Sequence, residues 1–189
     1  MDLRSVNFLS TGISTLISVG ISSWTAYFFA ERKTVKEHKR QDKKERDELD
    51  RKKKTVALQI ASRFEVFTFE CAKFAIGISS PGDDGGIART SVPPLDDSTI
   101  DGSPLDADDH ARILDFLREV NLEREQLNEH WDDVAADWED MARAAAYILQ
   151  AEGLRAMKLA KDLRDNYGVL KLNMSPSQKM LFSALVDID

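Results

Sequence analysis

The chain has few residues that would cross-link it or interrupt it. Its single cysteine, Cys71, excludes an intramolecular disulfide and fits a reducing compartment. No stretch of useful length alternates apolar and polar residues as a half-buried strand does. Glycine and proline are absent between residues 21 and 76, so one long helix can run there without a break. We therefore expect an all-α protein.

A segment near the amino terminus lacks charge. Residues 7–30 contain no Asp, Glu, Lys, Arg or His, and a helix of this length crosses a hydrocarbon layer about 30 Å thick. We predict an N-terminal transmembrane helix within residues 1–30. Basic residues follow the segment instead of preceding it, which argues against a cleaved signal peptide. They predict a single-pass protein of the inner (plasma) membrane, with the N-terminus outside and the C-terminal domain cytoplasmic. The side chains expected at the membrane interface are Trp24, Tyr27, Arg32, Lys33 and Lys36.

Small hydroxyl residues recur every four positions within this predicted span. A stripe of small residues allows two helices to approach closely, which indicates a face for transmembrane association. In the alternative interpretation, the same hydroxyl groups donate hydrogen bonds to backbone carbonyls of their own helix. Both interpretations remain open for Ser10, Ser14, Ser18 and Ser22.

A charged neck follows at residues 31–54, with 12 Lys/Arg and 7 Asp/Glu. Opposite charges lie four residues apart many times, a spacing that stabilises a solvated helix. The remaining residues, 55–189, are acidic, with 13 Lys/Arg and 25 Asp/Glu. Because acidic surfaces repel phosphate backbones, we expect the lipid bilayer as the partner of the neck and no nucleic acid.

The third region, residues 55–189, has two apolar stripes at helical spacing. The first runs from 57 to 78 and the second from 113 to 148. Two such helices should pack as a cytosolic antiparallel helical hairpin or bundle. Gly153 predicts a break or bend, Gly168 a stop, and Ser175-Pro176 the start of a short last helix. The side chains expected in the helix seam are Phe64, Phe67, Trp131 and Trp138.

Residues 79–105 hold four of the five prolines and are predicted to form a disordered loop. The spacing of Asp97, Thr99, Asp101 and Asp108 resembles a calcium-binding loop. Threonine in place of a carboxylate, and prolines where an entering helix should lie, argue against that interpretation. An acidic linker that ends in a helix cap explains the same residues.

No catalytic motif follows the span. His38, His110 and His130 lack the neighbours that a metal site needs, and Cys71 lies on an apolar stripe as a core thiol does. We therefore predict no catalytic residue, no metal site and no cofactor. For a ligand site inside the bundle, only Arg124 and Glu70 stand out as buried polar candidates.

The segment from Leu154 to Gly168, LRAMKLAKDLRDNYG, together with Phe69-Glu70-Cys71-Ala72 and the charged neck, resembles uncharacterised bacterial membrane-anchored helical proteins, often of mobile-element origin. The resemblance implies a bacterial inner-membrane setting and no particular activity. The leading hypothesis is a single-pass membrane protein whose helical domain acts by protein-protein interaction or self-association. The alternatives are a phage- or mobile-element-type membrane effector, such as a lysis or exclusion factor, and a ligand-binding or enzymatic helical bundle.

Overall fold

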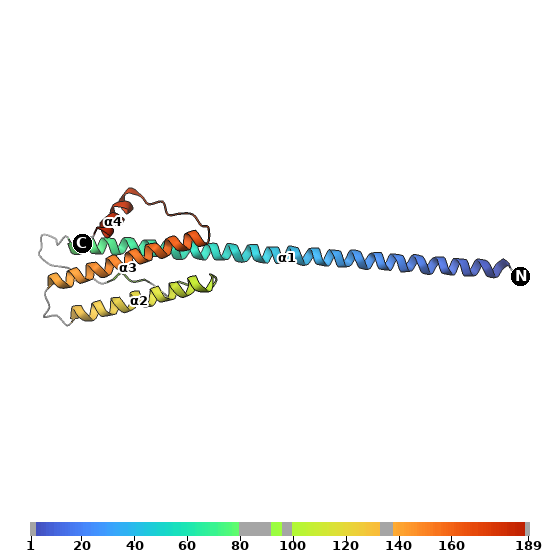
Figure 1. The fold of residues 1–189 in the computed structure, drawn as a ribbon, viewed down its shortest axis with the longest axis horizontal. Helices are drawn as coiled ribbons and strands as arrows, with labels where there is room; N and C mark the ends of the chain where they lie inside the picture. Colours follow the sequence, from blue (N-terminus) through green and yellow to red (C-terminus); the bar gives the residue numbers. More distant parts are fainter. Residues whose placement is uncertain (1–2, 80–91, 96–99, 133–137, 188–189) are drawn as a thin grey trace. The chain divides into compact units, whose positions relative to one another are not determined.

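The computed structural model describes residues 3–79, 92–95, 100–132 and 138–187, and it describes side chains within 32–77, 92–95, 100–129 and 140–187. Residues 1–50 and 51–189 form two compact units. The described residues contain helices and no strand, which confirms the all-α class (Figure 1). The helices are α1 (Leu3–Ser79), α2 (Ala107–Asp132), α3 (Trp138–Asn166) and α4 (Pro176–Val186).

The first unit consists of the amino-terminal part of α1. Residues 32–50 are helical and every one is exposed, including Arg32, Lys33 and Lys36. A solvated neck helix is what the alternating charges predict. Within the part of the chain that the structure describes, no helix is long and apolar enough to cross a membrane. The side chains of residues 1–31 lie outside that part, and they include Trp24, Tyr27 and the four serines of the predicted association face.

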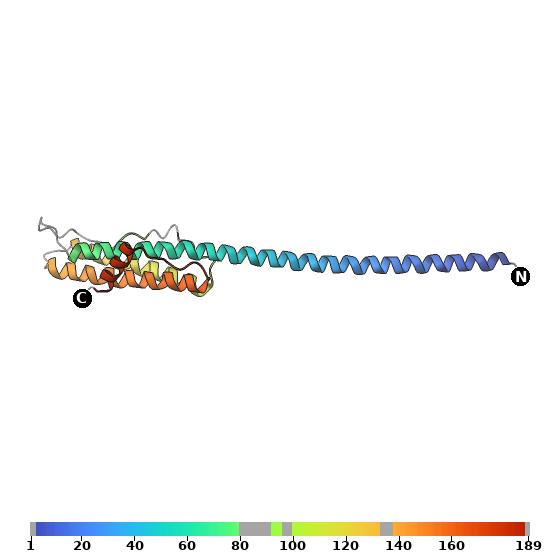
Figure 2. The same ribbon diagram turned by 90° about the horizontal axis from the view of Figure 1, so that it is seen from above.

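The second unit is built around the carboxyl-terminal part of α1, which lies beside α2 and α3 (Figures 1 and 2). Its core contains Phe64 and Phe67, both of which are buried. Both rings meet the ring of Phe116 on α2 edge to face, with centroids 5.1 and 6.1 Å away. Such contacts add to the free energy gained by removing the rings from water. Trp131 and Trp138 lie on α2 and α3, but their side chains are outside the described set.

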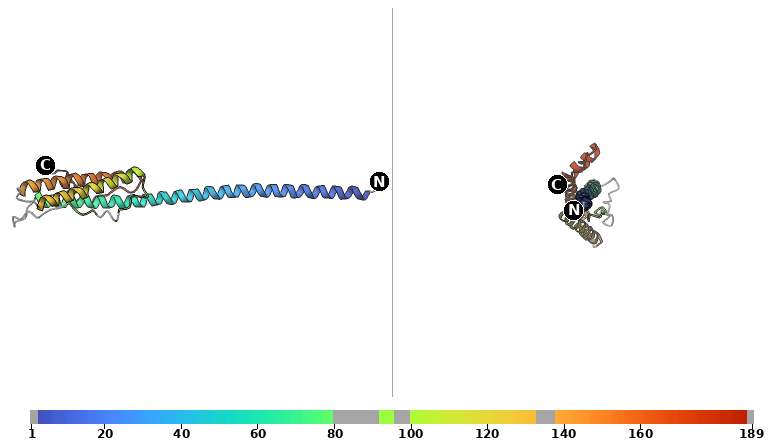
Figure 3. Two further views of the ribbon diagram at one scale, coloured as in Figure 1. Left: turned by 90° about the horizontal axis from the view of Figure 1, so that it is seen from below. Right: turned by 90° about the vertical axis from the view of Figure 1, so that its right-hand side faces the viewer.

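The three long helices of this unit do not all alternate in direction. Lys53 Nζ lies 2.7 Å from Asp106 Oδ1 at the start of α2, and Phe64 contacts Phe116 further along both helices. Residue numbers therefore increase in the same direction along both helices, which means that α2 runs parallel to α1. By contrast, α3 runs antiparallel to α1, since Glu65 meets Arg164 and Thr68 meets Gly153. The left view in Figure 3 shows α2 and α3 lying along the carboxyl-terminal part of α1.

One predicted helix is two helices in the structure. The stripe from 113 to 148 was expected to form a single long helix packed antiparallel to the first. Instead, α2 ends at Asp132 and α3 begins at Trp138, and the two lie side by side in opposite directions. Arg112 Nη2 is 2.5 Å from Asp162 Oδ2, and Arg155 pairs with Glu119. The predicted bundle is present. Its antiparallel neighbours are α2 with α3, which both come from the second stripe, and α1 with α3.

The parallel arrangement of α1 and α2 requires the chain to return along the bundle between them. Described parts of the predicted loop lie in the core: Val92, Leu95, Ile100 and Leu105 are all buried. The predicted disorder therefore does not hold for these residues. Residues 80–91 and 96–99, with Asp97 and Thr99 of the calcium-like spacing, lie outside the described part.

Gly153 does not break α3, which runs from Trp138 to Asn166, so of the break or bend expected there the break is wrong. Thr68 Oγ1 donates to the Gly153 carbonyl over 2.9 Å. A Cβ added at Gly153 would lie 3.1 Å from Cys71 Cβ and 2.9 Å from Leu185 Cδ2. Glycine therefore allows α1 and α4 to approach α3 closely at this point, since even a Cβ would require Leu185 and Cys71 to shift.

The predicted end of α3 and start of α4 are confirmed. Gly168 has a φ of 60°, the left-handed conformation that commonly follows a helix. At α4, Ser175 and Gln178 form a reciprocal capping box with Pro176 in the first turn. The fully buried Leu185 then holds α4 against the bundle.

Candidate functional site

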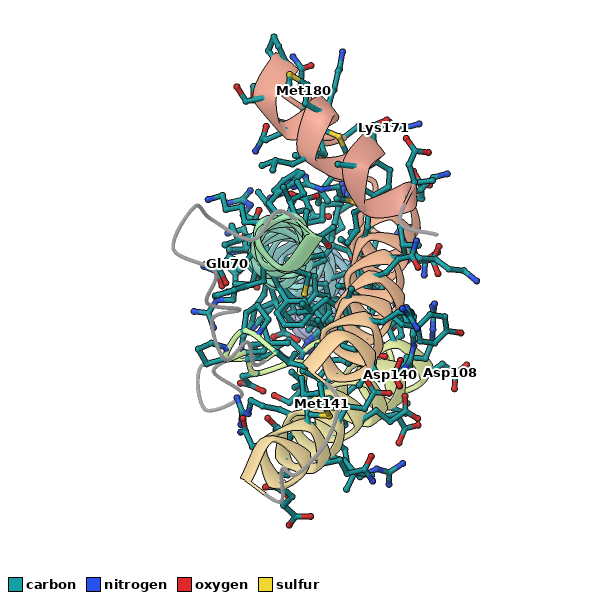
Figure 4. The ribbon with its side chains drawn as sticks, turned by 90° about the vertical axis from the view of Figure 1, so that its left-hand side faces the viewer. Glu70, Asp108, Asp140, Met141, Lys171 and Met180 are labelled. Atoms are coloured by element: carbon teal, nitrogen blue, oxygen red, sulfur yellow. The ribbon has the colours of Figure 1, made fainter. Side chains whose placement is uncertain are left out.

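Among the described residues of the second unit, Asp109 is buried where Arg112 and Asn166 donate to it, and charged side chains are buried at two further places. Glu65, Glu152 and Arg164 are all at least nine-tenths buried, and such groups are rare unless they are paired or functional. The two candidates expected from sequence are less buried. Arg124 donates to Asn121 on its own helix, and Glu70 lies on the side of α1 away from α3 (Figure 4). The structure does not bring these two into either buried site.

The first buried site is a cluster of carboxylates around one guanidinium. Glu152 on α3 is 1% exposed, and its Oε1 accepts from Arg155 Nη1 over 2.7 Å. The other guanidinium nitrogen donates to Glu119 on α2. Arg155 also lies over the Phe116 ring, 5.8 Å from its centroid. One arginine therefore joins α3 to α2 while its guanidinium lies over an aromatic ring of the core.

Glu123, also on α2, completes this carboxylate cluster. Its carboxyl group interacts with that of Glu152, and each has one buried oxygen without a conventional hydrogen-bond partner among the described atoms. Burial, followed by the charge of Glu152, raises the pKa of Glu123 to about 7. Burial likewise raises the pKa of Glu152, although Arg155 opposes the shift.

These two carboxyl groups can hold one proton between them near neutral pH. When two carboxylates share a confined site, ionisation of both is unfavourable, and the proton serves as the missing donor. Glu119 behaves differently, since its pKa is lowered by the exposed contact with Arg155. The arrangement therefore contains a proton-binding pair and a neighbouring carboxylate that stays ionised.

The second buried site is the ion pair between α1 and the end of α3. Arg164 donates from Nε to Glu65 Oε1 over 2.5 Å and from Nη2 to Oε2 over 2.9 Å. The same guanidinium donates to the Leu170 carbonyl and, over 3.4 Å, to Ser62 Oγ. With its donors used in this way, Arg164 connects α1, α3 and the chain that follows α3. We assign it a structural role.

Potential metal ligands are not gathered at either place. Within the described ranges, no group of three or more His, Cys, Asp or Glu side chains could hold a metal ion. Asp101 accepts from the Ser103 amide over 3.0 Å, as in a local turn. His110 packs against Gly102, and Cys71 is fully buried, as predicted for a core thiol. Burial and the neighbouring Glu152 and Glu70 raise the pKa of its thiol, so it is a poor nucleophile.

An apolar groove lies on the outer side of α2. Leu114 and Leu122, two turns apart, are 51% and 52% exposed. Together with Ile100 and Leu117 they line a groove of about 750 Å³. Arg118 and Glu125 stand at its polar edge. Large exposed apolar side chains in one groove with a charged rim are typical of a surface that another molecule covers.

The fold and these features define an all-helical domain with a buried carboxyl pair and an exposed apolar groove, joined to a charged helix. No protein-family model, no curated protein and no solved structure matches the chain.

Proposed function

We propose that this chain is a single-pass membrane protein whose helical domain binds another protein or a second copy of itself. The observation that carries the proposal is the groove on α2, because Leu114 and Leu122 expose about half their surface in water. Burying that surface against a partner helix would add roughly 25 cal/mol for each Å² of apolar area removed from water.

Membrane attachment is the second part of the proposal, and it rests on sequence. Residues 7–30 are uncharged over a length that fits a bilayer, and they precede the exposed basic residues Arg32, Lys33 and Lys36. In this proposal the protein belongs to the bacterial inner membrane, with residues 1–6 outside and the helical domain in the cytoplasm. Anionic lipid would attract the basic start of the neck by about 1 kcal/mol for each cation near the surface.

The groove can be tested by placing charge in its apolar part. Leu114→Asp and Leu122→Asp, combined in the full-length chain, should abolish cross-linking to the partner or to a second copy, because a carboxylate cannot be buried there without a counter-ion. Tyr147→Asp provides the matched control, since Tyr147 on α3 is 70% exposed and does not line the groove.

The outcomes distinguish the two kinds of partner. Loss of a cross-linked species with twice the mass of the chain would identify self-association, and loss of a species of any other mass would identify a different protein. If the Leu114 and Leu122 variant cross-links as the unaltered chain does, while remaining folded, the groove is not the binding surface and this part of the proposal fails.

The orientation can be tested by fusing reporters to the carboxyl terminus. A fusion that is active only in the cytoplasm should be active on this chain, and one that requires the periplasm should be inactive. The opposite pattern would show that the helical domain faces outward.

A further inference from the structure

A separate cavity lies beneath the segment that joins α3 to α4. It has a volume of about 410 Å³, which is within the range of small-molecule sites. Its apolar part comes from three elements: Met157 on α3, Leu172 and Met174 on the connecting segment, and Phe182 on α4. Each of these four side chains is half-buried, so the cavity is open to a ligand from solvent.

The wall of this cavity is fixed at both ends. The buried guanidinium of Arg164 holds the connecting segment through the Leu170 carbonyl. The capping box of Ser175 starts α4 at the other end, and Leu185 anchors that helix in the core. Because these contacts hold both ends of the segment against the bundle, the segment forms a fixed wall of the cavity.

The charges at the cavity favour an anion. Arg164 and Glu65 neutralise each other at its base. Lys171 is 3.9 Å from Asp165 in an exposed pair. Lys161 also lines the cavity, and no carboxylate among the described side chains lies within ion-pair distance of it. Of the charged side chains that line the cavity, three are cations and two are carboxylates, so the lining carries one net positive charge.

We propose that this cavity binds a small aromatic carboxylate. The aromatic ring lies among the two thioethers and the phenyl group of Met157, Met174 and Phe182, since sulfur and ring edges make favourable contacts. The carboxylate lies beside Lys161 and Lys171, which supply the attraction at the rim. The site is distinct from the groove on α2, and it would make the domain a receptor for a metabolite-sized acid.

The test follows the methionine methyl groups of the full-length chain by NMR, with 2-naphthoate as the probe. The signals of Met157 and Met174 should shift in a saturable way that fits one site. Met141 and Met180 are internal controls: Met141 is buried toward α2, and Met180 is 74% exposed on α4 (Figure 4). The uncharged analogue naphthalene-2-carboxamide should bind at least about tenfold more weakly, because it lacks the charge that Lys161 attracts.

Two variants separate this site from general adhesion to apolar surface. Lys161→Glu should weaken 2-naphthoate at least about tenfold, whereas Lys179→Glu, which reverses an exposed charge on α4 outside the cavity, should leave binding unchanged. Met174→Trp should fill the cavity and prevent binding. If Met180 responds as strongly as Met157, or if Lys161→Glu binds as the unaltered chain does, the proposal is overturned. Lys161 is exposed, so its replacement tests the site even if Met174→Trp does not fold.

Discussion

The half-buried Glu123 and the buried Glu152 predict that the stability of the helical domain falls as pH rises through neutrality. The pKa of Glu123 is raised from 4.5 to about 7 in the folded chain. The folded state therefore binds a proton that the unfolded state releases between these values. The stability contributed by this proton is fully present below pH 4.5, declines as pH rises toward 7, and is lost above 7.

The magnitude follows from the shift. A difference of one pKa unit corresponds to about 1.4 kcal/mol, so a rise from 4.5 to about 7 sets an upper limit of roughly 2.5 kcal/mol for the change between pH 5 and 8.5. Glu123 is only partly buried, and solvent reduces the effect. We expect a change of about 1 to 2.5 kcal/mol.

Replacing the acid by its amide isolates this effect. Glu123→Gln keeps the shape of the side chain and donates permanently to Glu152, so the variant should lose the pH dependence contributed by Glu123. Its free energy of unfolding should be close to that of the unaltered chain at pH 5 and higher by about 1 to 2.5 kcal/mol at pH 8.5. The assay is urea unfolding of the full-length chain across this range, followed by the helical circular dichroism signal.

The control is Glu125→Gln, two residues further along α2. Glu125 is exposed, so this variant should reproduce the pH dependence of the unaltered chain. If Glu123→Gln is less stable than the unaltered chain at pH 8.5, or if the stability difference between the two does not change with pH, the shared proton does not exist.

Three further predictions concern packing. Arg164→Ala should lower the free energy of unfolding by about 3 to 5 kcal/mol, measured by urea unfolding, because Glu65 would stay buried without its counter-ion; an effect below 1 kcal/mol would contradict the assigned structural role. Gly153→Val should destabilise the fold by more than about 2 kcal/mol in the same assay, since a side chain would meet Cys71 and separate the helices; a neutral effect would show that they do not meet there. Native Cys71 should resist alkylation at pH 8 and react once the protein is unfolded in urea, as followed by mass spectrometry; rapid modification of the folded chain would place the thiol at the surface.

The helices themselves could be predicted from periodicity, but their arrangement could not. The stripe on α1 correctly indicated that Phe64 and Phe67 are buried. The second stripe indicates one helix, and not the two that the structure shows, because no glycine or proline interrupts it near residue 135. The sequence does contain one signal for a new helix: Asp137 lies directly before Trp138, with Asp140 three residues later, a pattern common at helix starts.

The direction of α2 could have been inferred from the length of the connection that precedes it. Short loops favour antiparallel neighbours, whereas a long connection can return along the bundle and leave its flanking helices parallel. In residues 79–105, however, the prolines and acidic residues indicate a disordered linker and not a connection that returns along the bundle. The buried residues within it, such as Val92 and Ile100, are too widely spaced to show any helical or strand period.

The buried charges could not be predicted because they are created by contacts between distant helices. Glu152 and Arg155 are three residues apart on α3, as are many exposed pairs on solvated helices. Only the approach of α2, which brings Glu119 and Glu123, makes this pair part of a buried cluster. Likewise, the partner of Arg164 is Glu65, which lies on another helix. Both contacts join residues of different helices, so no spacing within one helix indicates them.

Membrane attachment through residues 1–30 is tested most directly by alkaline carbonate extraction of membranes that contain the full-length chain. An integral protein remains in the membrane pellet under these conditions, whereas a peripheral one is released. We expect the full-length chain in the pellet and a variant lacking residues 1–30 in the supernatant. Release of the full-length chain by carbonate would contradict the account, and so would retention of the truncated one.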